Sequence, residues 1–200
     1  MPVYYRFVPK ASFIAKVWWQ MNDTYVEPGN WDQNAPGIVP VWMDFDGKEG
    51  MEAYMRSEPL DRSQNGEGVV ADCFWFGVYE GRLLGSGYYY QVRPALWRLN
   101  RPPKIMKYVM EADLAGYMAM YISLFDSPES TIIAANDLWR LEGLVPTRLT
   151  AGSLHHNLTL ATFDDFAVKR YMQFGQPYLN SKASGQHGRV TLEIIEYPFQ

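Results

Sequence analysis

Alternating hydrophobic and polar residues predict β-strands near both ends of the chain. The alternating segments are Val3 to Val8, which Pro9 ends, Leu154 to Thr162, and Val190 to Phe199. Successive side chains of a strand point to opposite faces, so this pattern gives each strand one buried and one exposed face. Two shorter apolar runs, Ala95 to Leu99 and Thr131 to Ala135, predict further strands.

The middle of the chain carries the pattern of a β-hairpin. Val69 to Tyr79 and Leu83 to Val92 are rich in β-branched and aromatic residues, and Glu80-Gly81-Arg82 separates them. Two such runs around a short turn that contains glycine typically pair as antiparallel strands.

Apolar residues at helical spacing predict helices at five places. The predicted helices are Lys10 to Met21, Glu49 to Ser57, Pro102 to Leu124, Asp137 to Leu141 and Asp164 to Phe174. The third is the longest, because its apolar residues from Met106 to Leu124 recur every three or four positions and its two prolines suit a helix start. Gly143 is placed to cap the fourth helix.

The order of these elements predicts an α/β (α+β sandwich) fold, with helices flanking a mixed, mostly antiparallel sheet. Loops are expected at Asn22 to Pro40, Ser57 to Gly68 and Gly175 to Gly188, which are rich in turn-forming or polar residues. The first of these loops is long enough to suggest partner binding. With 200 residues and no internal repeat, the chain is expected to form a single domain over residues 1–200.

Composition narrows the classes of partner. The net charge of −4 gives no bulk attraction to nucleic acid or to anionic lipid. No run approaches the roughly 18 consecutive apolar residues of a membrane-spanning helix, and the first ten residues show no secretory signal, so a cytoplasmic location is expected. Seven Trp, 14 Tyr and 10 Phe favour contacts with a protein partner or self-association, because such residues suit interfaces as well as cores.

Two stretches make the chain similar to the Gcn5-related N-acetyltransferase (GNAT) family. Gly77 to Gly85 (GVYEGRLLG) looks like the second hairpin of that family, and Asn136 to Val145 (NDLWRLEGLV) resembles its late helix and the strand that follows. The resemblance covers most of the chain from Tyr4 onward and implies a GNAT-like fold with an insertion, Asp164 to Gly188, before the last strand.

The stretch Arg82 to Gly87 spells R-x-x-G-x-G, which in that family is the loop that binds the pyrophosphate of acetyl-CoA. Such a loop needs a helix directly after its glycines, because the free N–H groups of the helix start bind the anion. Here Tyr88-Tyr89-Tyr90 favours a strand, and Pro94 would interrupt a helix. The sequence therefore favours a hairpin over a cofactor loop, and no cofactor over acetyl-CoA.

GNAT-like domains without the loop occur among internal virion proteins of short-tailed phages. The stretch Ala95 to Tyr121 looks like those proteins, in which a strand bearing a Trp leads into a basic segment and a long amphipathic helix. This resemblance implies a phage protein that is a component of the virion, as the alternative to a cytoplasmic location.

Other residues with catalytic or metal-binding potential are isolated. His155, His156 and His187 do not have the spacing of a two-histidine phosphoesterase, and a structural role is favoured over a catalytic or metal-binding one. Cys73 lies in an apolar run, which predicts a buried and inert thiol. The stretch Asp44 to Gly47 begins like a calcium loop but lacks its later ligands, and Asp164-Asp165 suits the start of a helix.

The sequence leaves three functions open, of which a histidine-based hydrolase or metal enzyme is the least favoured. The preferred one is a soluble, non-catalytic GNAT-like module, or pseudoenzyme, that acts through protein–protein contacts. The alternative is an acyl-CoA-dependent N-acetyltransferase, for which no general base can be named. No catalytic, cofactor-binding or metal residue is therefore assigned.

Overall fold

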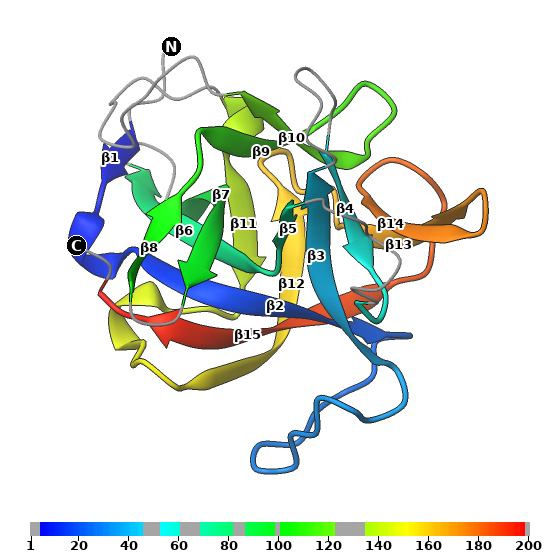
Figure 1. Ribbon diagram of the computed structural model, residues 1–200, viewed down its shortest axis with the longest axis horizontal. Helices are drawn as coiled ribbons and strands as arrows, with labels where there is room; N and C mark the ends of the chain where they lie inside the picture. Colours follow the sequence, from blue (N-terminus) through cyan, green and yellow to red (C-terminus); the bar gives the residue numbers. More distant parts are fainter. Residues whose placement is uncertain are drawn as a thin grey trace.

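The computed structural model describes residues 5–45, 53–60, 69–81, 87–98, 101–122 and 135–198. Within these ranges the protein consists of β-strands and three short 3₁₀ turns, with no α-helix. Six strands form a closed antiparallel barrel, in which each strand pairs with the next along the chain and the last pairs with the first (Figure 1). They are β2 (Phe13–Met21), β6 (Cys73–Gly81), β7 (Tyr88–Arg98), β11 (Trp139–Glu142), β12 (Leu154–Thr162) and β15 (Gly188–Glu196).

The barrel closes where the first half of β2 pairs with β6. Phe13 lies opposite Phe76 in this register, and their rings stack with centroids 4.9 Å apart. The second half of β2 leaves β6 and pairs instead with a neighbouring strand, so the barrel continues into a second group of strands. One strand thus belongs to both parts of the sheet.

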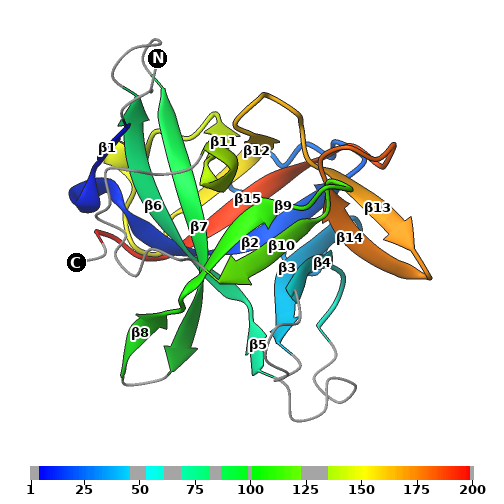
Figure 2. The same ribbon diagram turned by 90° about the horizontal axis from the view of Figure 1, so that it is seen from above.

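The second group extends the sheet in the order β3 (Ile38–Phe45), β4 (Ala53–Ser57), β10 (Met118–Ile122) and β9 (Tyr108–Ala112). A hairpin of β13 (Lys169–Gln173) and β14 (Gln176–Asn180) pairs with β4 and projects from the body of the molecule in both ribbon views (Figure 1 and Figure 2). Three short strands pair with β6, β3 and β7, namely β1 (Tyr5–Phe7), β5 (Val69–Ala71) and β8 (Arg101–Ile105). The 3₁₀ turns are η1 (Pro9–Ala11), η2 (Ala135–Asp137) and η3 (Pro146–Arg148).

Side chains fill the interior of the barrel. Inward-facing residues of the barrel strands, among them Val17, Phe76, Val92, Leu160 and Leu192, form one continuous core with residues of β3, β4, β9 and β10. The gap that remains among the described residues has a volume of about 10 Å³, roughly the space of one water molecule. The barrel is therefore a packed core like that of other small barrels, and binding is expected on its outer surface.

The α/β sandwich and the GNAT-like fold are wrong. A GNAT fold requires helices that flank a sheet, whereas segments predicted as helices form strands here. Strand β2 lies in the predicted helix Lys10 to Met21, β4 in Glu49 to Ser57, and β13 in Asp164 to Phe174. The longest predicted helix, Pro102 to Leu124, contains most of β8 and all of β9 and β10. Part of β11 lies in Asp137 to Leu141. The phage-type resemblance depended on the same long helix and fails with it.

Hydrophobic residues on both faces of these strands caused the error. Seven of the nine residues of Cys73–Gly81 are buried, and β2 is buried along most of its length. A strand covered on both sides is apolar throughout, so positions three and four apart are apolar as well. Helical spacing then appears without a helix.

Several strand predictions are confirmed. Strand β12 has the predicted bounds, β1 lies within its predicted segment, and β6 and β7 pair as the predicted hairpin. Strand β15 overlaps its predicted segment but begins two residues earlier, at Gly188. The predicted strand Ala95 to Leu99 falls largely within β7, while Thr131 to Ala134 lies outside the described residues. The segment Gly175 to Gly188, expected to be a loop, contains β14. A single domain over the whole chain stays a prediction.

No helix in the described part of the chain is long and apolar enough to cross a membrane.

Candidate functional site

A row of aromatic side chains with one arginine crosses the outer face of β3, β4, β14 and β13. Trp42 lies opposite Arg56, Arg56 lies opposite Tyr178, and Tyr178 lies opposite Tyr171. Directly opposed residues of neighbouring strands point to the same side of a sheet. The four side chains therefore lie next to one another across four strands.

The sequence of β4 explains why Arg56 faces outward. Along this strand Ala53, Met55 and Ser57 are buried, whereas Tyr54 and Arg56 are half-buried. This is the alternation of a strand with one face on the core. Because the core side is taken by the small and apolar residues, the two large polar side chains are held at the surface.

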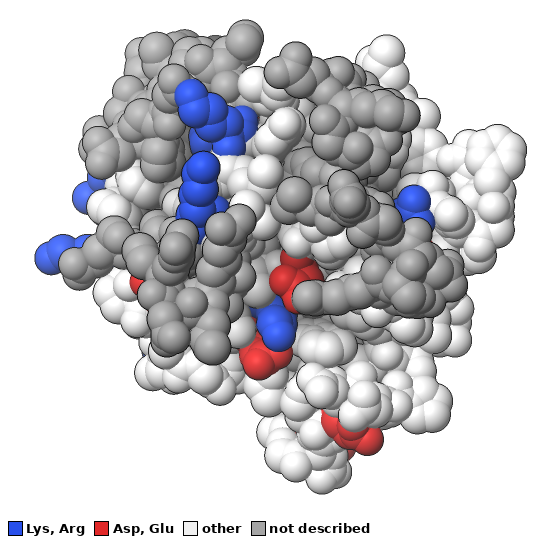
Figure 3. All heavy atoms as spheres, viewed as in Figure 1, with Lys and Arg blue, Asp and Glu red and all other residues white. Residues whose placement is uncertain are grey.

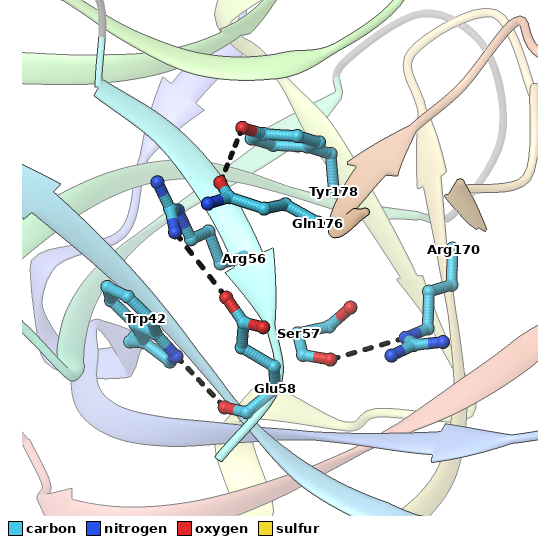
Figure 4. Close-up of polar contacts among 7 residues, drawn as sticks. All are labelled: Trp42, Arg56, Ser57, Glu58, Arg170, Gln176 and Tyr178. Atoms are coloured by element: carbon cyan, nitrogen blue, oxygen red, sulfur yellow. Dashed lines mark hydrogen bonds and ion pairs between the residues drawn. The ribbon is translucent and has the colours of Figure 1, made fainter. Parts of the chain in front are cut away.

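Two aromatic rings hold the Arg56 guanidinium between them. Its central carbon lies 5.3 Å from the ring centre of Trp42 and 5.8 Å from that of Tyr178. Both distances lie within the range of cation–π attraction, which contributes about 0.5–2 kcal/mol. Arg56 Nη1 also lies 3.5 Å from a carboxylate oxygen of Glu58, as Figure 4 shows.

Backbone and side-chain hydrogen bonds fix the surroundings of Arg56 (Figure 4). Trp42 Nε1 donates to the backbone oxygen of Glu58 at 2.9 Å, and the Tyr178 hydroxyl donates to Gln176 Oε1 at 2.9 Å. Arg170 Nε donates to the backbone oxygen of Ser57 at 3.2 Å, which ties β13 to the end of β4. The indole of Trp42 is only 2 % exposed, so it supports the row from beneath.

Two further tyrosines extend the row. Tyr54 lies 5.9 Å from Tyr117 and 6.0 Å from Tyr178 between ring centres, and Tyr117 lies 6.0 Å from Tyr171. These pairs meet edge to face, the geometry that aromatic rings prefer. We call Trp42, Tyr54, Arg56, Tyr117, Tyr171 and Tyr178 together the aromatic face.

The surroundings of Tyr117 favour the neutral form of its hydroxyl. Burial, together with the neighbouring Tyr171, Asp113 and Tyr178, raises the pKa of the Tyr117 hydroxyl from its ordinary value. A neutral phenol both donates and accepts hydrogen bonds. The aromatic face therefore offers rings, hydroxyl groups and one guanidinium to a binding partner.

The three histidines do not converge. His155 and His156 lie on β12, whereas His187 is exposed just before β15. Among the residues that the structure describes, no three side chains of His, Cys, Asp or Glu are grouped to hold a metal ion. A metal site at these histidines would require all three side chains to meet at one place, and they do not.

His155 contacts the hydroxyl of Ser153. The Ser153 hydroxyl donates to the backbone oxygen of Thr150 at 2.6 Å and lies 2.9 Å from His155 Nε2. The tautomer of His155 decides which of the two groups donates in the second contact. While the hydroxyl hydrogen points at Thr150, Nε2 is the donor and the contact positions the ring of His155.

His156 belongs to a polar network that attaches loop 22–37 to the barrel. Its Nδ1 lies 3.1 Å from the Thr191 hydroxyl, which donates to Gln20 Oε1 at 3.1 Å. Gln20 also accepts from the backbone N–H of Asn157 and donates to Asn157 Oδ1. Asn157 in turn binds both the backbone N–H and the backbone oxygen of Val26, at 2.9 Å each. Both Oδ1 and Nδ2 of the Asn157 side chain thus bind the backbone of the loop.

Burial lowers the pKa of His155 and of His156, and the charge of His155 lowers that of His156 further. Trp31 of the loop packs on the His156 ring, with ring centres 5.2 Å apart. Both imidazoles are therefore favoured in their neutral form. A structural role, as the sequence favours, explains these contacts.

A carboxyl pair connects β9 to η2. Burial, and then the charge and hydrogen bond of Glu111, raise the pKa of Asp137 to about 7, against the lowering effect of Arg93. The Asp137 carboxyl therefore keeps its proton up to near neutrality. Arg93 is itself buried, and its guanidinium lies over the ring of Trp75. Its Nε donates a hydrogen bond to Gln91 Oε1.

The helix that a cofactor loop at Arg82 to Gly87 would need does not follow Gly87. Residues 82–86 lie outside the described part, but Gly87 leads directly into β7, which begins at Tyr88. A strand presents no cluster of free N–H groups at its start, unlike a helix. Strands β6 and β7 pair on either side of this stretch, as the hairpin interpretation predicts.

The remaining candidates are placed as follows. Cys73 is buried in β6, and burial together with Asp72 raises the pKa of its thiol to about 12, so it is inert at neutral pH. Asp44 lies in β3, and residues 46–50 fall outside the described residues. Asp164 and Asp165 do not begin a helix; they lie in the turn after β12, where Asp165 pairs with Arg140.

The aromatic face was missed at the level of sequence. Its signal is present in Tyr54, Arg56 and Glu58, which alternate with smaller or apolar residues as in a strand. The helix predicted over Glu49 to Ser57 hid this alternation. Tyr171 and Tyr178 were likewise assigned to a helix and to a loop, so their pairing was not foreseen.

Comparisons with protein-family models, with curated proteins and with solved structures find no match to this chain.

Proposed function

We propose that this protein is a non-catalytic binding module that recognises another protein through the aromatic face. The observation that supports this most is the Arg56 guanidinium held between Trp42 and Tyr178 on an outer sheet surface. Tyr, Trp and Arg are the residues most enriched where protein interfaces gain their binding energy.

The rigidity of the face supports the same proposal. Its side chains are fixed by cross-strand neighbours and by the hydrogen bonds of Trp42 and Tyr178. A surface that is ordered before binding loses little conformational entropy when it meets a partner. The packed barrel beneath it supplies the rigid support.

Charge argues against nucleic acid as the partner. On the side of the molecule seen in Figure 3, both basic and acidic side chains appear among the described residues, and most of the described surface is uncharged. Binding to a phosphate backbone requires many clustered Lys and Arg side chains. The net charge of −4 points the same way.

Capture from a native lysate of the source organism tests the proposal. The double substitution Arg56→Ser with Tyr178→Ser removes the central contacts of the face and is expected to reduce capture of a specific protein at least tenfold. The matched control is Arg189→Ser with Tyr25→Ser, because Arg189 also lies over a tyrosine ring, at 6.0 Å, but at loop 22–37. This control is expected to bind like the wild type.

Three results would contradict the proposal. The wild type captures no protein above background, the Arg56/Tyr178 variant binds as well as the wild type, or the Arg189/Tyr25 variant alone loses binding. The last result would move the binding site to the loop between Asn22 and Pro40, where the sequence analysis expected it. Thermal melting of both variants shows that each remains folded.

A further inference from the structure

A cavity of about 210 Å³ lies where four segments that are distant in the sequence meet. Its lining comes from the turn between β9 and β10, from η2 and the start of β11, from the connection of β12 to β13, and from Ser181-Lys182. The described residues that line it include none of the aromatic face. The cavity is therefore a separate candidate for a binding site.

Aromatic side chains give the cavity an apolar wall. Trp139 is buried, and its Nε1 donates to a backbone oxygen of β9 at 2.9 Å, so the indole needs no polar partner from a ligand. Phe163 is held by the rings of Tyr5 and Tyr89, whose centres lie 6.0 Å and 5.4 Å from its own. This wall therefore favours the apolar part of a ligand, above all a ring.

Two exposed apolar side chains line the same cavity. Leu114 is 98 % exposed and Phe166 is 58 % exposed. A concave site that combines apolar side chains with a few polar groups is typical of ligand binding. A ligand in the cavity would remove part of this apolar surface from water, which favours binding.

The polar groups of the cavity differ in what they leave for a ligand. Ser181 Oγ and Lys182 Nζ donate to backbone oxygens of the turn between β9 and β10, at 3.3 Å and 3.1 Å. Asp113 accepts the backbone N–H of Tyr117 through Oδ1 at 2.8 Å and has a second carboxylate oxygen. Asp164 is exposed, and among the described residues no hydrogen bond or ion pair engages its carboxylate. Carboxylate oxygens accept hydrogen bonds and attract cations, so they are the groups that a ligand can use.

The charges of the lining also favour a cation. Asp113 and Asp164 carry two negative charges, and Lys182 carries one positive charge. Charges act more strongly within a cavity than on an open surface, because less water screens them. An excess of one negative charge therefore attracts a cationic ligand and repels an anionic one.

Basic side chains of the neighbouring segments do not line the cavity. Arg140 forms ion pairs with Asp165 and Glu142. At the base of the β13–β14 hairpin, Arg170 donates from Nε to the backbone of β4 at 3.2 Å. Neither these arginines nor Lys169 belong to the lining, so its own charges stay as described.

The volume fits one ring with a short side chain. A cavity of about 150 Å³ is known to accept benzene, so about 210 Å³ leaves space for a few further atoms. Aromatic ring faces such as those of Trp and Phe also attract an ammonium group directly. Size, hydrogen bonding and charge thus agree on one class of ligand.

We propose that this cavity binds a small organic cation, whose ring packs against Trp139 and Phe163 and whose ammonium group lies at Asp113 and Asp164. The apolar wall supplies affinity, and the carboxylates select the cation over neutral or anionic molecules of the same shape. The site does not depend on the function proposed above, because it is separate from the aromatic face.

Calorimetric titration with phenethylammonium chloride tests this proposal. One molecule is expected to bind per chain, in the millimolar range or tighter, as is usual for a ligand of this size. Phenylethanol and phenylpropionate have the same ring but are neutral and anionic. Phenylethanol is expected to bind at least threefold more weakly, and phenylpropionate not measurably. Added salt is expected to weaken the binding of phenethylammonium but not that of phenylethanol.

The double substitution Asp113→Asn with Asp164→Asn removes both carboxylates and keeps their shape. It is expected to lower the affinity for phenethylammonium to that for phenylethanol and to leave the affinity for phenylethanol unchanged. The matched control is Asp23→Asn with Glu27→Gln, which removes two exposed carboxylates of loop 22–37, away from the cavity lining. This control is expected to bind like the wild type, although its net charge changes by the same amount.

Two further measurements locate the ligand. Nuclear Overhauser effects are expected between the ring protons of phenethylammonium and the side chains of Trp139 and Phe163. Asn136 is exposed at the cavity, so Asn136→Trp can fill it without disturbing the core. This variant is expected to keep the melting temperature of the wild type and to lose binding of phenethylammonium and of phenylethanol alike.

Any of five results would overturn the proposal. Phenethylammonium does not bind at millimolar concentration, phenylpropionate binds as tightly, the Asp113/Asp164 variant or Asn136→Trp binds like the wild type, the Asp23/Glu27 control loses as much affinity, or the Overhauser contacts lie outside the cavity. Asp164→Asn is expected to keep the partner capture described above, so the failure of this proposal is distinguishable from that of the proposed function.

Discussion

Gly116 shows how one residue decides local structure. It ends the turn between β9 and β10, donates its N–H to the backbone oxygen of Asp113 at 2.9 Å, and has φ of +89°. The helix predicted over Pro102 to Leu124 ran through this glycine. A conformation that only glycine adopts easily, in a tight turn, outweighed the helical spacing of the apolar residues around it.

Gly116→Ala is expected to destabilise the protein more than Gly29→Ala. Both glycines have φ near +88°, so the backbone strain of an alanine is nearly the same. A Cβ at Gly116 would lie 2.7 Å from Lys182 Cβ and 2.8 Å from Asn180 Oδ1, whereas a Cβ at Gly29 meets nothing within 4 Å. The expected difference is about 1–3 kcal/mol, the usual cost of overpacking. Urea unfolding of both variants measures it, and equal losses would contradict the packing at this turn.

Individual strands differ in how well their sequence predicts them. Strand β12 was predicted with its bounds because its alternation is clear, and the β6–β7 hairpin because a glycine turn joins two β-rich runs. Strands β2, β4 and β13 were assigned as helices because their apolar positions also fit helical spacing. The aromatic face depends on β4 and β13, so it was lost together with them.

Loop 22–37 shows a connection between elements that no local pattern predicts. Its anchor is Asn157, which lies 131 residues from Val26 and has φ of +60° within β12. Irregularity in the pairing of β12 and β15 occurs at this place. The Asn157 side chain thus bonds the backbone N–H and oxygen of Val26, as the backbone of a neighbouring strand would do in a sheet.

Asn157→Gly is expected to lower the free energy of unfolding by about 2–4 kcal/mol. Glycine keeps the positive φ but leaves the backbone N–H and the backbone oxygen of Val26 without their partner, and each unsatisfied buried group costs about 1–3 kcal/mol. The amide of Val26 is expected to exchange with deuterium at least tenfold faster. Unchanged exchange at Val26 would show that the network does not hold the loop. Asp23→Gly, which also removes a residue of positive φ but has an exposed side chain, serves as the control.

The closed barrel could not be predicted from the sequence. Its closure depends on three residue pairs between β2 and β6, and β3, β4 and β5 lie between these two strands in the sequence. Strands β8 to β10 likewise separate β7 from β11, and β13 and β14 separate β12 from β15. Such long-range pairings leave no periodic signal, whereas the number of short strands and the aromatic content do favour a β-rich protein.

Two sets of groups are expected to give the stability of the whole molecule opposite dependences on pH. The folded-state pKa of Asp137 is raised from 3.8 to about 7, so its contribution is present at low pH and is lost as pH rises from about 4 to 7. The folded-state pKa values of His155 and His156 are lowered from 6.5, so their contribution is present above pH 6.5 and is lost as pH falls below it.

Unfolding by urea between pH 4 and 8 separates the two effects. The difference in stability between the wild type and Asp137→Asn is expected to fall as pH rises, because only the wild type must give up the shared proton. The difference between the wild type and His156→Gln is expected to rise with pH. If the free energy of unfolding of the wild type changed with pH in parallel with that of a variant, the environment described for the substituted residue would be wrong.

Hydrogen–deuterium exchange of the complex with its captured partner tests the central claim most directly. If the aromatic face is the binding surface, bound protein is expected to show slower exchange in residues 53–58 and 169–180 and unchanged exchange in residues 22–37. Slower exchange confined to residues 22–37, or no change in residues 53–58 and 169–180, would contradict the assignment of this face as the site of recognition.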